Sequence, residues 1–341
     1  MTRSELIELL SIDDPKALQR LFARTQVVQS SVVGTKVFLR GLIEYSNRCR
    51  KNCYYCGIRG GNRRVGRYEL TDGEVLQAVD FAWRNRYGSI VLQSGERQSA
   101  RFVSRIARLL RQIKEHTHGE VGITLSCGEQ PDEVYRQWFE AGAHRYLLRI
   151  ETASPALYAR LHPATPAHDF DARITALHQL KAIGYRTGTG VMIGLPFQTP
   201  GDLADDLLFF RRMDVAMVGM GPYLEHRDTP LYRYKDRLLP PAQRLTLALK
   251  MVAALRLLMP HINIAATTAL QALHPTGREQ ALQAGANVFM PNLTPVEYRA
   301  SYRLYDSKPC LHESPGLCMD CTACRIRLAG NEIGYGEWGD R

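Results

Sequence analysis

The sequence lacks the segments that mark membrane, secreted and repetitive proteins. It contains no run of about 18 apolar residues, which excludes a transmembrane helix. The stretch from Met1 to Phe22 carries acidic side chains and no apolar core segment, so we expect no signal peptide and a cytoplasmic protein. Internal repeats and low-complexity segments are also absent. With 45% hydrophobic and 23% charged residues, the composition excludes disordered, collagen-like and coiled-coil chains.

A chain of 341 residues buries most of its apolar surface without help from disulfides or metals. Its length suits about two domains, or one α/β barrel of roughly 250 residues with additions. Structural disulfides are rare in the cytoplasm, so the eight cysteines are expected to be metal ligands or core residues. The formal net charge of +10 is typical of proteins that bind nucleic acid or small anions, and equally of a basic solvated surface.

Short apolar runs alternate with longer amphipathic runs along most of the chain. The expected strands cover residues 36–46, 88–96, 119–129, 144–153, 185–196, 215–223, 262–268 and 286–292. The expected helices cover residues 72–85, 99–116, 131–142, 171–184, 200–213, 241–258 and 276–285. This alternation predicts parallel strands, and eight units favour a complete (β/α)8 TIM barrel over an open sheet.

We therefore expect three parts: an N-terminal helical extension (1–33), the barrel (34–300) and a C-terminal extension (301–341) that loses the alternation. Gly142, Gly184 and Gly285 come directly after expected helices. Glycine in that position commonly ends a helix in the left-handed conformation, so we expect that conformation at all three.

Three cysteines follow the first expected strand with the spacing Cys49-x3-Cys53-x2-Cys56. The spacing lets all three thiolates converge from one loop, at the strand end where barrel active sites lie. Structural zinc sites and electron-transfer 4Fe–4S clusters usually take four ligands, whereas three cysteines leave one iron of a 4Fe–4S cluster open to another ligand. A zinc site completed by a distant residue is the alternative.

The triplet, with Tyr55 directly before its third cysteine, resembles the signature of the radical SAM superfamily. In that superfamily the open iron binds the amino and carboxylate groups of S-adenosylmethionine (SAM). An electron from the cluster then cleaves SAM to a 5′-deoxyadenosyl radical. The resemblance implies a barrel of the radical SAM type, with a 4Fe–4S cluster and SAM as cofactors and Tyr55 close to them.

The cysteine loop is strongly basic. Seven Lys or Arg residues and no acidic residue lie from Arg48 to Arg67. They are Arg48, Arg50, Lys51, Arg59, Arg63, Arg64 and Arg67. Nearby cations would stabilise a negatively charged cluster and raise its potential. Some are expected to face an electron donor such as an acidic ferredoxin or flavodoxin. For any one of them, a solvated loop face is the alternative.

Polar groups also follow the other expected strands. Arg149 and Glu151 share one face of the fourth strand, because side chains alternate along a strand. Charges that point inward there are costly unless they meet a charged ligand or each other, so ligand binding and a structural ion pair both account for them. The other candidates at strand ends are Ser94, Gly95, Glu96, Thr124, Gly190, Thr267, Thr268 and Met290. Gly190 would allow a ligand to approach the backbone closely.

Longer stretches are similar to the HydE family of FeFe-hydrogenase maturases, which belongs with biotin synthase and methylornithine synthase. These stretches are SNRCRKNCYYCGIR, SIVLQSGE, EAGAHRYLLRIETASP, GLPFQT, DDLLFF, MVGMGPYLEHRDTPL, LTLALKMVA, INIAATTA and GANVFMPNLTPVEYR. The resemblance implies a radical SAM enzyme that works with the other hydrogenase maturases. Its substrate would be an iron precursor with cysteine, carbon monoxide and cyanide ligands, used to build the diiron subcluster.

The same resemblance implies roles for single residues. The cluster would be held by Cys49, Cys53 and Cys56, and the methionine amino group of SAM would meet Ser94, Gly95 and Glu96. SAM would also contact Glu151 and Arg173, and its pocket would be lined by Tyr302 and Met290. Anionic groups would be bound by Arg149, Thr124, Thr267 and Thr268. Two features depart from the family. The stretch LHPATPAHDFDAR is about three residues longer, which bears on Arg173. Ile150 stands where the family has His, which we interpret as a packing change because alternation points it away from Arg149.

The remaining cysteines lie mostly near the C-terminus, as Cys310-x7-Cys318-x2-Cys321-x2-Cys324. HydE proteins variably carry an accessory iron–sulfur cluster on three cysteines spaced like the first three here. We expect such a cluster near the surface, with zinc or reduced thiols as alternatives and Cys324 as a fourth ligand or a bystander. Cys127 stands alone and is expected to be inert or part of a cavity wall.

Other functions remain as alternatives. One is a radical SAM enzyme with a small organic or amino-acid substrate, similar to methylornithine synthase. Biotin synthase is disfavoured, because its auxiliary cluster needs several Cys and Arg ligands inside the barrel and only Cys127 lies on an expected strand. Another alternative is a non-catalytic iron–sulfur carrier. Nucleic-acid binding is not expected, since the basic residues match no recognition motif.

Overall fold

Eight parallel strands form the centre of the computed structural model, which describes residues 1–340 except for the side chains of residues 317 and 318. The strands are β1 (Lys36–Ser46), β2 (Ser89–Ser94), β3 (Gly122–Ser126), β4 (Arg145–Leu147), β5 (Arg186–Thr189), β7 (Met217–Val218), β9 (Asn263–Ile264) and β10 (Val288–Phe289). Neighbours from β1 to β9 in this order pair with each other, and β10 pairs with β1. Ala265, just after β9, bridges to Val288 in β10 and closes the ring. The predicted complete (β/α)8 barrel is confirmed.

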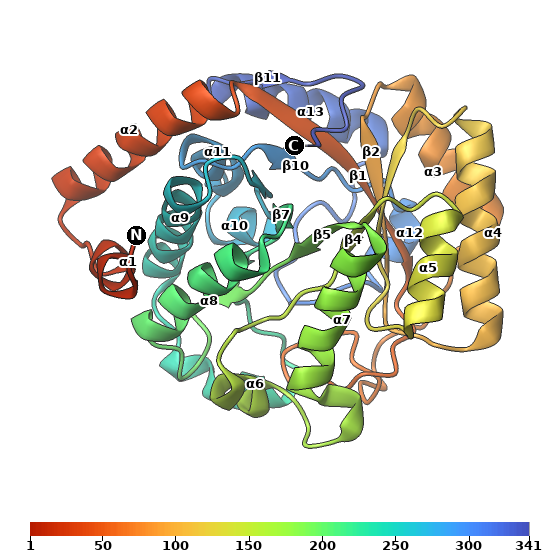
Figure 1. The fold of residues 1–341 in the computed structure, drawn as a ribbon, viewed down its shortest axis with the longest axis horizontal. Coiled ribbons are helices and arrows are strands. Elements are labelled where there is room, and N and C mark those ends of the chain that lie inside the picture. The colour runs from red at the N-terminus through yellow and green to blue at the C-terminus, as the bar shows by residue number, and fades with distance from the viewer. Residues whose placement is uncertain (341) are drawn as a thin grey trace.

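The expected helices surround the strands, as Figure 1 shows. They are α3 (Asp72–Arg84), α4 (Ala100–His116), α5 (Asp132–Glu140), α7 (Phe170–Ile183), α8 (Pro200–Met213), α9 (Pro241–Leu258) and α11 (Gly277–Gln283). Side-chain caps begin several of them: Thr71 and Glu74 form a capping box at α3, and Thr199 and Asp202 form one at α8. Gly142, Gly184 and Gly285 have φ values of 112°, 108° and 126°, so the predicted left-handed residues are confirmed.

The structure contains further elements that the sequence analysis did not predict. They are α6 (Pro155–Leu161), α10 (Thr268–Leu273), α12 (Val296–Arg299), α13 (Pro315–Leu328), and the 3-10 segments η1 (Pro166–His168) and η2 (Pro230–Arg237). Two further strands, β6 (Met192–Ile193) and β8 (Gly221–Pro222), continue the barrel strands β5 and β7 and pair with each other. A Cβ on Gly190 would lie 1.9 Å from the carbonyl oxygen of Gly219, so glycine is needed here for close packing of the backbones.

The N-terminal and C-terminal segments pack on the barrel. Helices α1 (Arg3–Leu10) and α2 (Pro15–Val32) lie beside α8 and α9. Strand β11 (Glu332–Ile333) pairs with the start of β1. The chain then crosses the amino-terminal end of the barrel, where Asp340 pairs with the buried Arg145. That end is therefore covered by the chain itself, and the polar candidates lie at the opposite end. None of the helices described is long and apolar enough to cross a membrane.

Candidate functional site

The three cysteines Cys49, Cys53 and Cys56 lie in the loop between β1 and α3. Burial raises the pKa of all three thiols, that of Cys53 to about 12, and the charges of Cys49 and Cys53 raise the pKa of Cys56 further. The thiols therefore face one another in a poorly solvated place, where a positively charged metal group would favour their thiolate forms.

The donor set fits an iron–sulfur cluster. Within the described part of the chain, no three His, Cys, Asp or Glu side chains surround a single point at the spacing of one metal ion. The cysteines of a 4Fe–4S cluster bind different iron atoms, so their sulfur atoms lie farther apart than the ligands of one ion.

Arg67 holds the cysteine loop in shape. Its guanidinium donates hydrogen bonds to the carbonyl oxygens of Asn47 (2.6 Å), Ile58 (2.7 Å), Arg59 (2.6 Å) and Asn62 (3.0 Å). A charged group that satisfies four main-chain acceptors fixes a loop that has no regular secondary structure. Arg67 thus acts on the loop backbone, in addition to any effect of its charge on a cluster.

The end of β2 lies against the first cysteine. The amide of Gly95 donates to the carbonyl oxygen of Ser46 (2.8 Å). A Cβ at Gly95 would lie 2.6 Å from the carbonyl oxygen of Arg48 and 2.8 Å from the Cβ of Cys49. Only glycine allows the end of β2 and the cysteine loop to approach each other this closely, so Gly95 is needed for their contact. Ser94 is buried and its hydroxyl donates to the carbonyl oxygen of Gly95 (2.9 Å).

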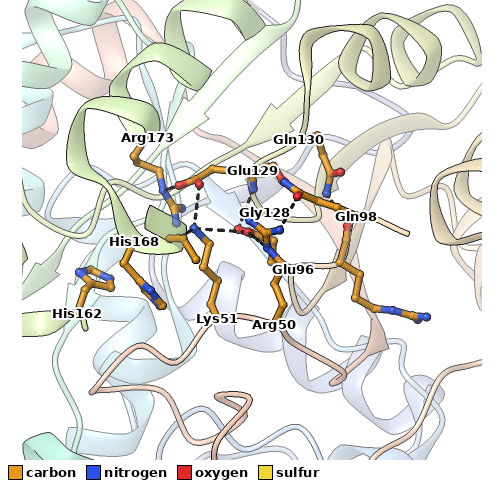
Figure 2. Close-up of polar contacts among 12 residues, drawn as sticks. Arg50, Lys51, Glu96, Gln98, Gly128, Glu129, Gln130, His162, His168 and Arg173 are labelled. Carbon is orange, nitrogen blue, oxygen red and sulfur yellow. Dashed lines mark hydrogen bonds and ion pairs between the residues drawn. The ribbon is translucent and has the colours of Figure 1, made fainter. Parts of the chain in front are cut away.

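Glu96 takes part in a buried charge network with Glu129, which Figure 2 shows. Its carboxylate accepts hydrogen bonds from the Arg50 guanidinium (3.0 Å) and the Glu129 amide (2.9 Å), and lies 3.4 Å from the Lys51 ammonium. Lys51 and Glu96 are only 3% and 4% exposed. Lys51 also binds the Glu129 carboxylate (2.8 Å) and the carbonyl oxygen of Ala167. The network joins the cysteine loop to the ends of β2 and β3.

Glu129 is a site residue that the sequence analysis missed. A signal was present: β2 and β3 are both followed by a Gly-Glu pair, Gly95-Glu96 and Gly128-Glu129. Gly128 has φ +75°, and a Cβ there would lie 2.4 Å from the Glu96 side chain. Equivalent positions on neighbouring parallel strands lie side by side, so the repeated pair indicates two adjacent carboxylates.

Arg173 at the start of α7 joins the same network. Its guanidinium forms an ion pair with Glu129 and donates to the carbonyl oxygen of Arg149 (3.1 Å). Burial works against its charge, but Glu129 raises the pKa of Arg173, so it remains a cation. Its charge acts on Cys53 and Tyr55. The longer segment before α7 still brings Arg173 to the site, and within that segment His168 accepts from the amide of Asn52 (2.9 Å).

Arg149 and Glu151 pair with each other. The Arg149 Nε lies 3.1 Å from both carboxylate oxygens of Glu151, and its terminal nitrogen donates to the carbonyl oxygen of Val191 (2.9 Å). Glu151 has φ +68°, which is strained for a residue with a side chain. The Glu151 charge raises the pKa of Cys53 and Cys56, so the carboxylate lies near these two cysteines. Ile150 between the two is fully buried in the core.

The Tyr55 side chain contacts His162, a second site residue that the sequence analysis missed. Burial lowers the pKa of His162 to about 3, so its ring is neutral at physiological pH. Its Nδ1 lies 2.9 Å from the carbonyl oxygen of Tyr158, which requires the proton on Nδ1. Nε2 then accepts from the Tyr55 hydroxyl (3.3 Å). Stacking on Tyr158, with ring centroids 3.9 Å apart, fixes the imidazole.

The remaining candidates surround the interior of the barrel. The Thr124 hydroxyl is fully buried and has no hydrogen-bond partner in the described structure, which suits a ligand there. Thr267 donates to the carbonyl oxygen of Met220 (3.4 Å), and Thr268 bonds the hydroxyl of Tyr305 (3.1 Å). Met290 is partly exposed, and its carbonyl oxygen accepts from Arg278.

Tyr302 is 1% exposed and lies close enough to Cys56 for their charges to interact. The ammonium of Lys308 lies over its ring and pairs with the buried Glu44 of β1. This contact anchors the segment after α12 to the barrel interior. Tyr302 therefore lies near the cysteine loop, and its place in a SAM pocket stays a prediction.

The C-terminal cysteines differ in their exposure. Cys310 is half-buried, Cys321 and Cys324 are exposed, and the side chain of Cys318 lies outside the described residues. The Arg325 guanidinium donates to the Cys321 sulfur (3.3 Å) and pairs with Glu279 (2.9 Å). The accessory cluster stays a prediction. Cys127 is fully buried, and burial raises its pKa to about 12.

Comparison with known proteins agrees with this geometry. The pattern of the Radical SAM superfamily matches residues 43–210. The chain is 45% identical over 340 residues to the FeFe hydrogenase maturase subunit HydE of Thermotoga maritima, covering all of this chain and 94% of the relative. It is 28% identical over 316 residues to 3-methylornithine synthase of Methanosarcina barkeri, covering 90% and 83%.

Solved structures show the same fold. The crystal structure of methylornithine synthase (PylB) superposes with a TM-score of 0.82 at 24% identity, covering 98% of this chain and 94% of that one. The crystal structure of the FeFe-hydrogenase maturase HydG superposes with a TM-score of 0.80 at 19% identity, covering 98% and 73%. The superfamily implies a 4Fe–4S cluster and SAM, as expected from the cysteine triplet. The chain belongs to the radical SAM superfamily and, within it, to the HydE family of FeFe-hydrogenase maturases, and is therefore a radical SAM enzyme.

Proposed function

We propose that the protein acts on an iron precursor carrying cysteine, carbon monoxide and cyanide ligands, on the way to the diiron subcluster of FeFe hydrogenase. The 45% identity to HydE over the whole chain is the observation that carries this proposal. When bound, the cluster and SAM supply the 5′-deoxyadenosyl radical that starts the chemistry. Cys49, Cys53 and Cys56 would hold the cluster.

The chain's own residues would bind and orient SAM. Glu151 lies near Cys53, and Arg173 is held as a buried cation by Glu129. Ser94, Gly95 and Glu96 remain candidates for the methionine amino group, although Glu96 already accepts from Arg50 and lies near Lys51. Tyr55, Gly190, Met290 and Tyr302 would complete the pocket.

The substrate would lie deeper in the barrel. Thr124 offers a buried hydroxyl without a partner in the described structure, Arg149 follows the end of β4, and Thr267 and Thr268 follow the end of β9. A cation and several hydroxyl groups suit the anionic ligands of the proposed iron precursor.

The other partners belong to the same proposal. A small protein such as ferredoxin or flavodoxin would deliver the electron, the other hydrogenase maturases would supply and receive the iron compound, and the enzyme would work in the cytoplasm. Cys310, Cys318, Cys321 and Cys324 would hold an accessory cluster, in which the half-buried Cys310 is the best protected described ligand.

The test is anaerobic reconstitution of the protein, followed by reaction with dithionite and SAM. We expect 5′-deoxyadenosine to form with the wild-type protein and not with C53S. Wild-type protein that yields no more product than C53S would contradict the enzymatic function and favour an iron–sulfur carrier.

A second assay separates the substrate classes. Maturation of apo-hydrogenase with and without this protein should require it. The overlap with 3-methylornithine synthase, 28% identity over 316 residues, keeps an amino-acid substrate as the second candidate. Formation of 5′-deoxyadenosine without any effect on hydrogenase maturation would favour that candidate.

A further inference from the structure

A basic, aromatic cleft lies on the outer side of the cysteine loop. Its volume is 610 Å³, and it is lined by Tyr54, Ala159, Arg160, Phe197, Pro230, Leu231, Arg233 and Tyr234. The site described above uses none of these residues. Tyr54 stands directly after Cys53 in the sequence, so the floor of the cleft belongs to the loop that holds the cluster ligands.

The backbone of Tyr54 ties the two walls of the cleft to this loop. Its amide donates to the carbonyl oxygen of Leu161 at the end of α6 (2.9 Å), and its carbonyl oxygen accepts from the amide of Leu231 in η2 (3.0 Å). Beneath the cleft, Leu157, Leu161 and Leu231 are buried in one apolar cluster against which Tyr54 packs. The walls are therefore rigidly coupled to the cysteine loop.

The rim of the cleft is cationic and exposed. Arg160 on α6 and Arg233, Lys235 and Arg237 on η2 are all exposed, and Asp236 is the carboxylate among them. None of these four cations forms a salt bridge with a described residue. Cations left unpaired in this way attract an acidic partner and accelerate its association.

Aromatic rings hold these cations in place. The guanidinium of Arg160 lies 4.9 Å from the ring centre of Phe197, and that of Arg233 lies 4.6 Å from the ring centre of Tyr234. Phe197 has φ +72°, a strained conformation that presents its ring to the cleft. Aromatic and arginine side chains together are the residues enriched at protein interfaces.

We propose that this cleft is the docking site of a small acidic one-electron carrier protein. The inference rests on the function proposed above and adds to it the place where the electron enters. The step oxidises the carrier by one electron and reduces the cluster by one electron, and no bond forms or breaks. An electron that arrives at the cleft has a short path through Tyr54 to Cys53 and Cys56, which is why a carrier would bind at this position.

The test compares two charge-reversal variants of the reconstituted enzyme. R160E/R233E reverses the rim of the cleft. R20E/R24E makes the same change in charge at exposed positions on α2, far from the cysteine loop in Figure 1. Flavodoxin serves as the probe, because it is an acidic one-electron carrier.

Binding of oxidised flavodoxin at low ionic strength is the first measurement. We expect R160E/R233E to weaken binding about tenfold or more, and R20E/R24E to stay within about twofold of the wild type. Wild-type binding should weaken as salt is added, and the variant should lose most of that dependence. Equal binding by the two variants would overturn the proposal, as would binding of a single-stranded oligonucleotide to the cleft as tightly as flavodoxin.

The rate of 5′-deoxyadenosine formation is the second measurement. With reduced flavodoxin as donor, the rate of R160E/R233E should fall about tenfold, and with dithionite it should match the wild type. A fall with both reductants would overturn the docking role. Wild-type protein that binds flavodoxin at the cleft but forms no product even with dithionite would instead contradict the proposed function. K235E, a single exposed change on η2, repeats the test if the double variant fails to fold.

Discussion

Arg67 shows how one side chain can fix a loop that contains no regular secondary structure. Four carbonyl oxygens between Asn47 and Asn62 accept from its guanidinium, and each charge-assisted hydrogen bond contributes about 1.5–3 kcal/mol. We expect R67A to leave the barrel folded and to reduce the iron bound after reconstitution by at least about half. Iron and sulfide analysis, together with circular dichroism, checks this. R63A, which changes an exposed arginine of the same loop, is the control, and equal iron contents would refute the role of Arg67.

Glu129 is expected to position Arg173. Changing it to Gln keeps its size but removes the charge that the Arg173 guanidinium and the Lys51 ammonium share. We expect E129Q to raise the KM for SAM roughly tenfold while kcat changes much less, because a misplaced cation weakens binding more than the chemistry. E129D should recover part of the affinity.

The readout for Glu129 is the steady-state rate of 5′-deoxyadenosine formation with dithionite. Q98A serves as a neutral neighbour, because the Gln98 amide donates to the carbonyl oxygen of Glu129 (2.8 Å) without sharing its charge. A KM for E129Q equal to that of Q98A would show that Glu129 does not position Arg173.

At the scale of elements, helix α8 reaches the site through Asp206. This carboxyl is fully buried and accepts from the amide of Ala153 (2.5 Å), two residues after Glu151. Burial raises its pKa well above the usual value, so the folded protein keeps this carboxyl protonated where the unfolded chain ionises it above about pH 4. Its contribution to stability is therefore complete below about pH 4 and decreases as the pH rises.

This decrease in stability with rising pH should be absent from D206N, because the amide of that variant is neutral at every pH. The melting temperature of D206N relative to the wild type should rise between pH 5 and pH 8. D205N lies one position earlier on the same helix, and among the described residues Asp205 pairs only with the exposed Arg3, so this variant should show no such trend. Thermal unfolding of the three proteins across that range decides the matter, and parallel curves for D206N and wild type would disprove the assignment.

Most of the secondary-structure elements that the strand and helix pattern failed to predict are short. Helix α6 has seven residues and η1 has three, so neither spans enough turns to show a helical period. Both lie in the segment after Glu151 that carries His162 and His168. The positions of these two imidazoles depend on contacts with Tyr55 and Asn52, which lie more than 100 positions away.

For the whole molecule, the C-terminal segment covers the amino-terminal end of the barrel. Asp340 pairs there with the buried Arg145 (2.6 Å), and the side-chain amide of Asn263 donates to the carbonyl oxygen of Gly339 (2.7 Å). Burial opposes ionisation of Asp340, but His144 and Arg145 lower its pKa to about 2. This stabilisation is present at neutral pH and is lost only as the pH falls from about 4 towards 2.

Removing that carboxylate leaves the Arg145 charge buried without its partner. Losing one member of a buried pair costs about 3–5 kcal/mol, and the partial exposure of Asp340 places the expected loss for D340N at the lower limit. Chemical unfolding at pH 7 measures it. E115Q, an exposed change on α4, should stay within about 0.5 kcal/mol of the wild type. A similarly small effect for D340N would mean that the segment does not hold this end closed.

The sequence by itself determined the barrel and the place of the three cysteines in the loop after its first strand. Alternating apolar runs and the Cys49-x3-Cys53-x2-Cys56 spacing are patterns among neighbouring residues, and local backbone geometry converts them directly into strands, helices and a converging loop. Only the tertiary structure decided that Glu129 meets Arg173, that Tyr55 meets His162, and that Asp340 reaches Arg145. These contacts join distant positions, and they depend on how closure of the ring brings the strand ends together.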